Sequence, residues 1–178
     1  MRLECPTCVV RDWDPADRDA LVRAADDRNV WRNLTDRFPH PYTTADADEW
    51  FAFLAAGDEP TDWAIEVGGE AVGGIGIEIG KGVSAHTAEF GYWLAEPLWG
   101  RGIVTCAARA VVPYAMARFR LFRLEAGVFA WNPASMRVLE KCGFVREGVA
   151  RAAVLKDGEV TDRVVFAFVD TAEADSGE

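Results

Sequence analysis

Two glycines separated by one arginine mark the segment of this chain best suited to hold an anion. The segment EPLWGRGIVT, residues 96–105, follows the strand-like TAEFGYWLA and precedes the apolar run AARAVVPYAMA. The first N–H groups of a helix have no partner within the helix and carry partial positive charge, so they hold anions where side chains leave room. Gly100 and Gly102 provide that room and Arg101 adds a positive charge. A strand-to-helix turn that needs glycine only for its backbone conformation is the alternative.

The composition and net charge of the chain indicate which kinds of binding partner suit it. The chain has 178 residues, of which 50% are hydrophobic and 27% are charged, and this length favours one globular domain with a sizeable core. Its net charge of -10 argues against general affinity for nucleic acid or for an anionic membrane, because phosphate binding depends on Lys and Arg. A basic or amine-bearing partner suits this charge better.

The start of the chain and its cysteines favour the cytoplasm. MRLECPTCVV has no long apolar stretch followed by small residues, so it does not resemble a secretory signal. Four cysteines fit a reducing compartment. Cys5 and Cys8 form a lone CPTC with no second Cys or His pair at a usable spacing, which predicts no metal site. This segment is interpreted as an opening strand with Pro6 on an edge.

The sequence predicts strands and helices in the order β, α, α, β, β, β, α, β, α, β, β. Asp14 and Pro15 predict the start of a helix within residues 12–34, and Thr44 is a candidate N-cap for a second one. Gly68-Gly69 predicts a hairpin with a two-residue turn. The later elements are a strand at about 87–95, a helix over 103–118, a strand at 121–130, a short helix from the cap Asn132 to Gly143, and two strands around 156–158. This order predicts an α+β domain in which one βαβ unit carries the glycine pair.

These segments resemble the GNAT superfamily of acyl-CoA-dependent N-acyltransferases. The resemblance lies in GYWLAEPLWGRGIVTCA, in NPASMRVLEKCGF thirty residues after Gly102, and in RNLTDRFPHPYTTADADEWF; it covers roughly residues 8–168. The branch is that of the RimJ/RimL ribosomal-protein N-terminal acetyltransferases. It implies a GNAT fold, a mixed and mostly antiparallel twisted sheet flanked by helices, with a central βαβ acyl-CoA-binding unit. The expected layout is one domain over 1–170 and a disordered acidic tail over 171–178.

The resemblance implies acetyl-CoA as acyl donor. In the family the main-chain amides of the loop, here Arg101 to Val104, hold the pyrophosphate of CoA. The strand end pairs with the pantetheine arm as an added strand would, and the Asn of the second motif bonds to it. Val104 departs from the usual Gly or Ala. The cofactor-binding residues carried over are Trp93, Leu94, Trp99, Gly100, Arg101, Gly102, Ile103, Val104 and Asn132.

Acyl transfer to an amine needs a base, an oxyanion donor and a proton for the leaving thiolate. Many superfamily members use a Tyr seven residues after the Asn as the acid, but Leu139 stands there, so Ser135 is the family's alternative candidate. Its other reading is a residue that bonds its own helix backbone. Glu89 is the preferred base over His86 and Glu78, because it lies on the strand that leads into the cofactor site. Substrate binding or a solvated edge charge is the alternative for Glu89.

The acceptor is expected to be a primary amine, on a protein N-terminus or a small molecule. His40 and Tyr42, in the Pro-rich loop, are candidate substrate-binding residues together with His86, and ordinary loop packing is the alternative. The function expected is that of an acetyl-CoA-dependent N-acetyltransferase, monomeric or homodimeric, with neither nucleic acid nor membrane as partner. A non-catalytic acyl-CoA-binding module of the same fold is the alternative.

Overall fold

The computed structural model describes residues 1–170, so the tail predicted over 171–178 lies outside the described residues. Main-chain contacts divide the chain into two compact units. Unit 1 comprises Met1–Gly76 and Tyr92–Ala110, and unit 2 comprises Ile77–Gly91 and the chain from Val111 onward. Three elements contribute residues to both units: β4 (Glu70–Ile79), β5 (Thr87–Leu94) and α4 (Ile103–Phe119).

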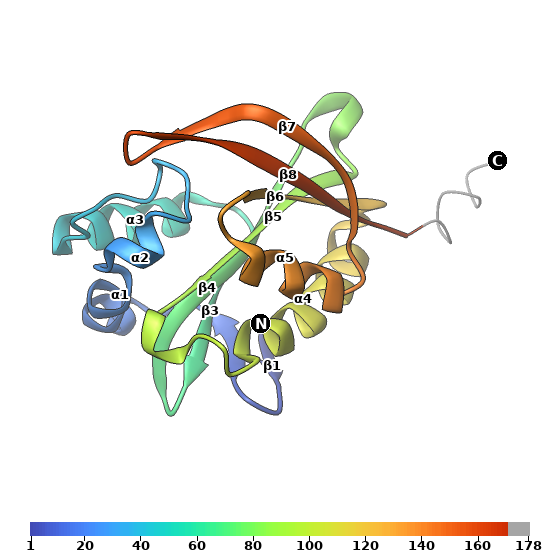
Figure 1. Cartoon of the computed structure of the whole chain (residues 1–178). Helices are drawn as coiled ribbons and strands as arrows, with labels where there is room; N and C mark the ends of the chain where they lie inside the picture. The colour runs from blue at the N-terminus through green and yellow to red at the C-terminus, as the bar shows by residue number, and fades with distance from the viewer. Residues whose placement is uncertain (171–178) are drawn as a thin grey trace. The chain divides into compact units, whose positions relative to one another are not determined.

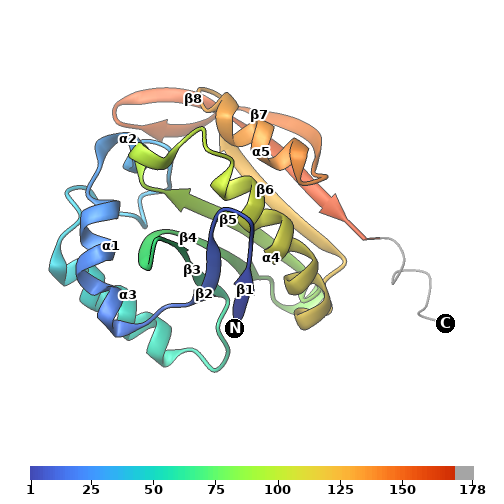
Figure 2. The ribbon, with the colours of Figure 1, turned by 90° about the horizontal axis from the view of Figure 1, so that it is seen from below.

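In unit 1 the strands follow one another as antiparallel neighbours. β1 (Arg2–Glu4) pairs with β2 (Val9–Asp12), and β2 pairs with β3 (Asp62–Val67), which Figure 2 shows side by side. β3 and β4 form a hairpin in which Val67 faces Glu70, and the turn residues Gly68 and Gly69 have φ angles of 63° and 87°. Such a turn requires positive φ at both positions, so the predicted glycine hairpin is confirmed.

The opening segment is a hairpin and not the single strand that the sequence predicts. The turn lies at residues 5–8, where the Cys5 N–H donates to the Cys8 carbonyl at 2.9 Å. Pro6 has no N–H to offer a sheet, and it stands in this turn. The prediction of one strand with Pro6 on its edge is therefore wrong, because the chain reverses at the proline.

The first predicted helix is broken into pieces. It consists of a 3-10 turn, η1 (Pro15–Asp17), followed by α1 (Arg18–Ala25) and α2 (Arg28–Trp31). Asp14 caps η1 as predicted, since its side chain accepts from the Ala16 N–H at 2.8 Å. The break occurs because Asp27 caps a new helix, and its carboxylate accepts the N–H groups of two residues in α2.

The next helix, α3 (Thr44–Ala56), has its N-cap one residue before the cap that the sequence predicts. Thr43 is the N-cap and forms a capping box with Asp46, whose carboxylate accepts the Thr43 N–H at 2.7 Å. Thr44 is thus the first helical residue. α1 and α3 pack against each other (Figure 1), and a cluster centred on Leu21, Ala25, Tyr42 and Ala47 lies among them.

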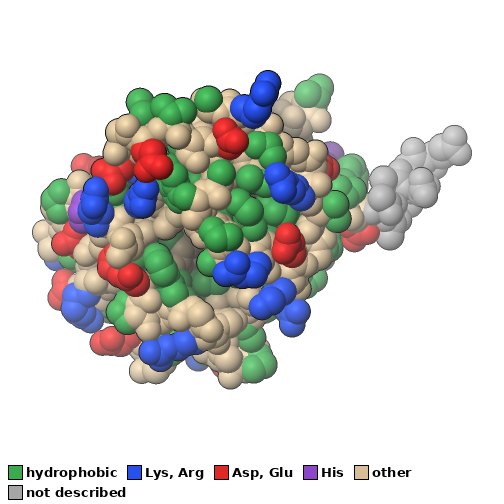
Figure 3. Space-filling model, viewed as in Figure 1, with side chains coloured by type: hydrophobic (Ala, Val, Ile, Leu, Met, Phe, Trp, Pro, Cys, Tyr) green, Lys and Arg blue, Asp and Glu red, His purple; other side chains and the backbone are tan. Residues whose placement is uncertain are grey.

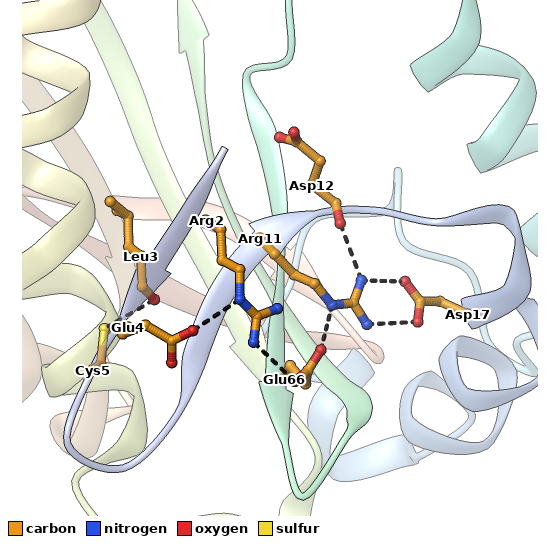
Figure 4. Close-up of polar contacts among 8 residues, drawn as sticks. All are labelled: Arg2, Leu3, Glu4, Cys5, Arg11, Asp12, Asp17 and Glu66. Carbon is orange, nitrogen blue, oxygen red and sulfur yellow. Dashed lines mark hydrogen bonds and ion pairs between the residues drawn. The ribbon is translucent and has the colours of Figure 1, made fainter.

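An arginine holds the first strands of unit 1 to η1. Arg11 donates two hydrogen bonds to Asp17, at 2.6 and 2.8 Å, and one to Glu66 at 2.5 Å (Figure 4). The side chains of Arg11, Asp17 and Glu66 are only 15%, 10% and 15% exposed. Burial raises the pKa of Asp17, but the bonds from Arg11 and from the Asp14 N–H outweigh it, so that the pKa lies below its usual range.

Unit 2 contains a mixed sheet. β5 runs parallel to β6 (Arg123–Phe129), β6 is antiparallel to β8 (Glu159–Val169), and β8 is antiparallel to β7 (Val145–Lys156). The mixed, mostly antiparallel sheet with flanking helices is the fold class that the sequence predicts. Alternate residues of β6 and β8 are buried on one face, among them Leu124, Ala126, Val128, Val164 and Phe166.

The short helix α5 (Pro133–Lys141) packs against β7 (Figure 2). Its ends are as predicted: Asn132 Oδ1 accepts the Ser135 N–H at 3.1 Å, and Gly143 follows the helix with a φ of 87°. Two short 3-10 turns complete the chain, η2 (Gly82–Ser84) in unit 2 and η3 (Glu96–Leu98) in unit 1.

The pairing of β5 with β6 is short. It joins Thr87–Glu89 to Arg123–Glu125, although β5 continues to Leu94. Only the first three residues of β5 therefore pair with β6. The main-chain groups later in β5 have no β6 ladder partner on that side.

The surface carries charges of both signs. On the face drawn in Figure 3, acidic and basic side chains are interspersed among apolar ones. Within residues 1–170, no helix combines the length and the apolar composition that crossing a bilayer requires.

Candidate functional site

The loop between β5 and α4 has the backbone that its glycines suggest. Gly100 and Gly102 both have a φ of 75°, in the left-handed region that side chains disfavour. A Cβ atom built on either residue would meet no atom within 4 Å. The protein itself thus demands glycine here for conformation, while the space beside the loop is open to a ligand.

The loop presents a row of main-chain donors. α4 begins at Ile103, and the Gly102 carbonyl accepts the N–H of Cys106 at 3.0 Å. Within residues 1–170, the N–H groups of residues 100–104 donate no hydrogen bond, and the exposed side chain of Arg101 makes no ion pair. Unused N–H groups beside a guanidinium at the start of a long helix favour binding of an anion.

The side chain of Trp99 fixes this loop to the end of β5. Its indole Nε1–H donates to the Leu94 carbonyl at 2.7 Å, and 43% of the residue remains exposed. The sequence places Trp99 in the cofactor site, and the structure adds that its N–H is used to hold the loop. The sequence contains no signal for this bond.

Trp93 lies against two glycines of β4. A Cβ on Gly73 would lie 2.4 Å from the Trp93 carbonyl oxygen, and one on Gly74 would lie 2.6 Å from the Trp93 Nε1. The ring of Phe38 packs edge-on against the indole, with centroids 5.3 Å apart. Gly73 and Gly74 are therefore needed because β4 and Trp93 approach each other closely. The glycines of the hairpin turn are needed for a different reason, their positive φ angles.

The side-chain amide of Asn132 uses its oxygen, but not its nitrogen, in a hydrogen bond within the described residues. Its Oδ1 caps α5 through the Ser135 N–H, and within the described residues its Nδ2 donates no hydrogen bond. The amide can thus cap the helix and donate to a ligand at the same time. Ser135 contributes its main-chain N–H to the cap, and its catalytic role stays a prediction.

Tyr42, a predicted substrate-binding residue, lies in the core of unit 1. It is 6% exposed, its ring is 5.1 Å from that of Phe38, and its N–H donates to Asp26 Oδ1 at 2.9 Å. Burial, assisted by the charge of Asp46, raises the pKa of the Tyr42 hydroxyl to about 12. These contacts are those of packing, and a role in binding stays a prediction.

The two histidines also have protein partners. The His40 ring tilts over Trp31 at 5.5 Å, with Nδ1 at 3.5 Å from Asp26 Oδ1. His86 stacks on Phe122 at 4.8 Å, and its Nδ1 lies 2.7 Å from a main-chain carbonyl. Their roles in substrate binding stay predictions.

Glu89 lines a cavity in unit 2. The cavity has a volume of about 320 Å³, and its charged lining residues are Glu78, Glu89, Glu125 and Arg163. Glu125 accepts a hydrogen bond from Arg123 at 3.0 Å. Glu89 is exposed and, within residues 1–170, makes no hydrogen bond or ion pair. The sequence singles out Glu89 but not the cavity, which strands far apart in the chain build together.

Three of the four cysteines interact with one another in unit 1. All four are free thiols, and Cys8 Sγ donates to the Ile103 carbonyl at 3.9 Å. Burial, followed by the charges of Cys5 and Cys106, raises the pKa of Cys8 to about 12, so the thiol stays protonated. Within residues 1–170, no group of three or more His, Cys, Asp or Glu side chains is arranged to hold a metal ion.

Comparison with known proteins gives a family match over most of the chain. Residues 8–145 match the family described as "Acetyltransferase (GNAT) domain". The chain is 48% identical over 85 residues to the probable N-acetyltransferase YjcK of Bacillus subtilis, which covers 48% of this chain and 47% of that protein. It is 26% identical over 162 residues to the L-amino acid N-acetyltransferase AaaT of Escherichia coli, covering 90% and 97%.

A solved structure shares the fold along most of its length. Mycobacterium smegmatis RimJ in complex with CoA-disulfide superposes with a TM-score of 0.82 at 25% identity, covering 98% of this chain and 87% of that one. The matches to curated relatives are shorter: the chain spans about half the length of the first ones it matches. The family match covers most of the chain, including the glycine loop and Asn132.

Proposed function

Because this chain belongs to the GNAT acetyltransferase family, we propose that it is an acetyl-CoA-dependent N-acetyltransferase that acts on a primary amine. The observation that carries the proposal is the set of unused main-chain N–H groups at residues 100–104, in an open loop at the start of α4. A diphosphate needs several donors and positive charge. This loop offers both.

We propose that the rest of the donor follows β5. The ladder with β6 ends at Glu89, so the later main chain of β5, through Trp93 and Leu94, is available to an amide-bearing arm. Pantetheine carries two amides and pairs with a strand as a peptide would. The free Nδ2 of Asn132 is proposed to donate to one of its carbonyl oxygens.

The proposed reaction is a direct transfer. The neutral amine nitrogen attacks the thioester carbonyl, the N–C bond forms, and the C–S bond breaks. The proton lost by the attacking nitrogen goes to the Glu89 carboxylate, which makes no bond within the described residues. The Ser135 hydroxyl is the proposed donor of the proton that the leaving thiolate takes up, and solvent water then returns a proton to Ser135 and removes the one held by Glu89. A main-chain N–H near Leu94 is the proposed oxyanion donor.

The class of acceptor is an amine in each relative whose name states one. AaaT is named for L-amino acids, and another Escherichia coli relative is named for the alanine of ribosomal protein uS5. We propose that this chain likewise takes a primary amine, on a protein N-terminus or a small molecule. The four free thiols fit a reducing compartment, and the cytoplasm is the proposed location.

A thiol-release assay tests the proposal. The protein is incubated with acetyl-CoA and a panel of amino acids, N-terminal peptides and polyamines, and free CoA is measured with a thiol reagent. Acceptor-dependent release with an acetylated product by mass spectrometry is the expected result. Binding of acetyl-CoA by calorimetry without release for any amine would refute the enzyme and leave a CoA-binding module.

A further inference from the structure

The cavity in unit 2 contains two charged side chains that the fold leaves without partners. Glu89 reaches it from β5 and Arg163 from β8. Neither makes a hydrogen bond or ion pair within residues 1–170, although both line the same 320 Å³ space. The cavity therefore presents one free negative and one free positive group.

The position of Arg163 depends on a glycine of the neighbouring strand. A Cβ on Gly127 of β6 would lie 2.9 Å from Cδ of Arg163 and 3.3 Å from its Cγ. The stem of the arginine thus lies across β6 where no side chain stands. Arg163 lines the cavity, while Arg123 is already bonded to Glu125 and Glu147.

We propose that this cavity binds an amine acceptor that also carries a carboxylate, with the amine at Glu89 and the carboxylate at Arg163. The inference rests on the proposed function and specifies its substrate class. A guanidinium binds a carboxylate through two parallel hydrogen bonds, whereas a carboxylate such as Glu89 attracts an ammonium. A simple alkylamine or polyamine leaves Arg163 without a partner.

The size of the cavity agrees with a small acceptor. Ligand pockets usually measure about 300–1,000 Å³, and this one is at the lower end. Two kinds of acceptor carry the required pair of groups: a free amino acid and the N-terminal Asp or Glu of a peptide. The experiment distinguishes the two.

The test compares matched acceptors in the thiol-release assay. L-alanine is paired with L-alaninamide, and the peptide amide Asp-Ala-Ala is paired with Asn-Ala-Ala. Arg163→Gln is expected to raise KM for the carboxylate-bearing member of one pair about tenfold, as for the loss of one charge-assisted hydrogen bond at an exposed site. Differences in amine basicity cancel, because each pair is compared between wild type and variant. The pair that responds identifies the kind of acceptor.

Three further variants control the result. Arg163→Lys keeps the charge and is expected to recover part of the affinity. Gly127→Ala pushes the arginine stem aside and is expected to raise the same KM with Arg163 still present. Arg151→Gln, on exposed β7 and outside the cavity, is expected to leave the preference unchanged.

Two outcomes overturn the inference, and they are distinct. If amines are acetylated but Arg163→Gln changes the kcat/KM ratio of neither pair, the cavity does not select a carboxylate, and the acetyltransferase proposal stands. If no amine releases CoA from the wild type, the proposed function fails, and this inference fails with it.

Discussion

Replacing Gly102 with alanine separates the conformational role of the loop from its role in binding. Gly102 and Gly158 share a φ of 75°, and a Cβ on either meets no protein atom within 4 Å. Gly158 lies in the tight turn between β7 and β8, away from the loop in sequence. Gly158→Ala is therefore a control with the same backbone strain and the same open surroundings.

The expected magnitudes follow from this match. A left-handed alanine costs about 1–2 kcal/mol, so both variants should lose about the same free energy of unfolding. A methyl group where the diphosphate approaches removes at least one charge-assisted hydrogen bond, worth about 1.5–3 kcal/mol. Gly102→Ala should therefore bind acetyl-CoA roughly 10- to 100-fold more weakly, and Gly158→Ala should bind it like the wild type.

Urea denaturation measures the two stabilities, and isothermal titration calorimetry measures the two affinities. Both the stabilities and the affinities are needed, because a variant that unfolds also fails to bind the ligand. Equal affinity of Gly102→Ala and Gly158→Ala for acetyl-CoA would refute the placement of the diphosphate. Unequal stability losses would refute the claim that conformation alone requires these glycines within the protein.

Three further predictions concern other side chains. Glu89→Gln should lower kcat by about a hundredfold while acetyl-CoA affinity is unchanged, because general bases contribute about 10²–10⁴; thiol release within twofold of wild type would exclude Glu89 as base. Ser135→Ala keeps the main-chain cap of α5, so urea denaturation should show wild-type stability, and a drop in kcat of about tenfold or more would report the hydroxyl; unchanged turnover would assign Ser135 to structure alone. Arg11→Met should lower the free energy of unfolding by about 3–5 kcal/mol, because it leaves the mostly buried Asp17 carboxylate without a cationic partner and leaves Glu66 only its longer pair with Arg2, whereas Arg18→Met, which breaks an exposed pair, should cost far less. The depressed pKa of Asp17 gives stability that is complete above its unfolded pKa of about 3.9 and is lost as pH falls through the folded value, so acid titration followed by circular dichroism should show this loss in wild type and less of it in Arg11→Met.

Local signals in the sequence predict the ends of elements well. Asn132 and Gly143 bound α5 as expected, because a side-chain cap and a left-handed glycine act within a few residues. The Gly68-Gly69 turn is equally local. The GNAT fold class follows from the order of such elements together with the family motifs.

Competing local signals account for the errors. The sequence offers two adjacent threonines, and the carboxylate of Asp46 selects Thr43 as the cap. The continuous helix expected after Asp14 is interrupted because Asp27 caps a new one. Pro6 fits both a strand edge and a turn, and the hydrogen bond between Cys5 and Cys8 decides for the turn.

Contacts across strands could not be predicted from one sequence. Arg163 reaches the space over Gly127 because β6 and β8 pair in one register, with Gly127 facing Val165. A shift of that register by one residue would turn the arginine to the other face. The cavity in unit 2 thus depends on pairing that no short motif encodes, and the same holds for the bond between Trp99 and Leu94.

That bond joins the two ends of the proposed donor site within unit 1. The indole belongs to the loop proposed for the diphosphate, and the carbonyl belongs to the strand end proposed for the pantetheine arm. Because this hydrogen bond is short, at 2.7 Å, a movement of the loop is expected to move the end of β5 with it. In the proposed binding mode, contacts to the unreactive nucleotide end of the donor would thus also help to position its reactive thioester.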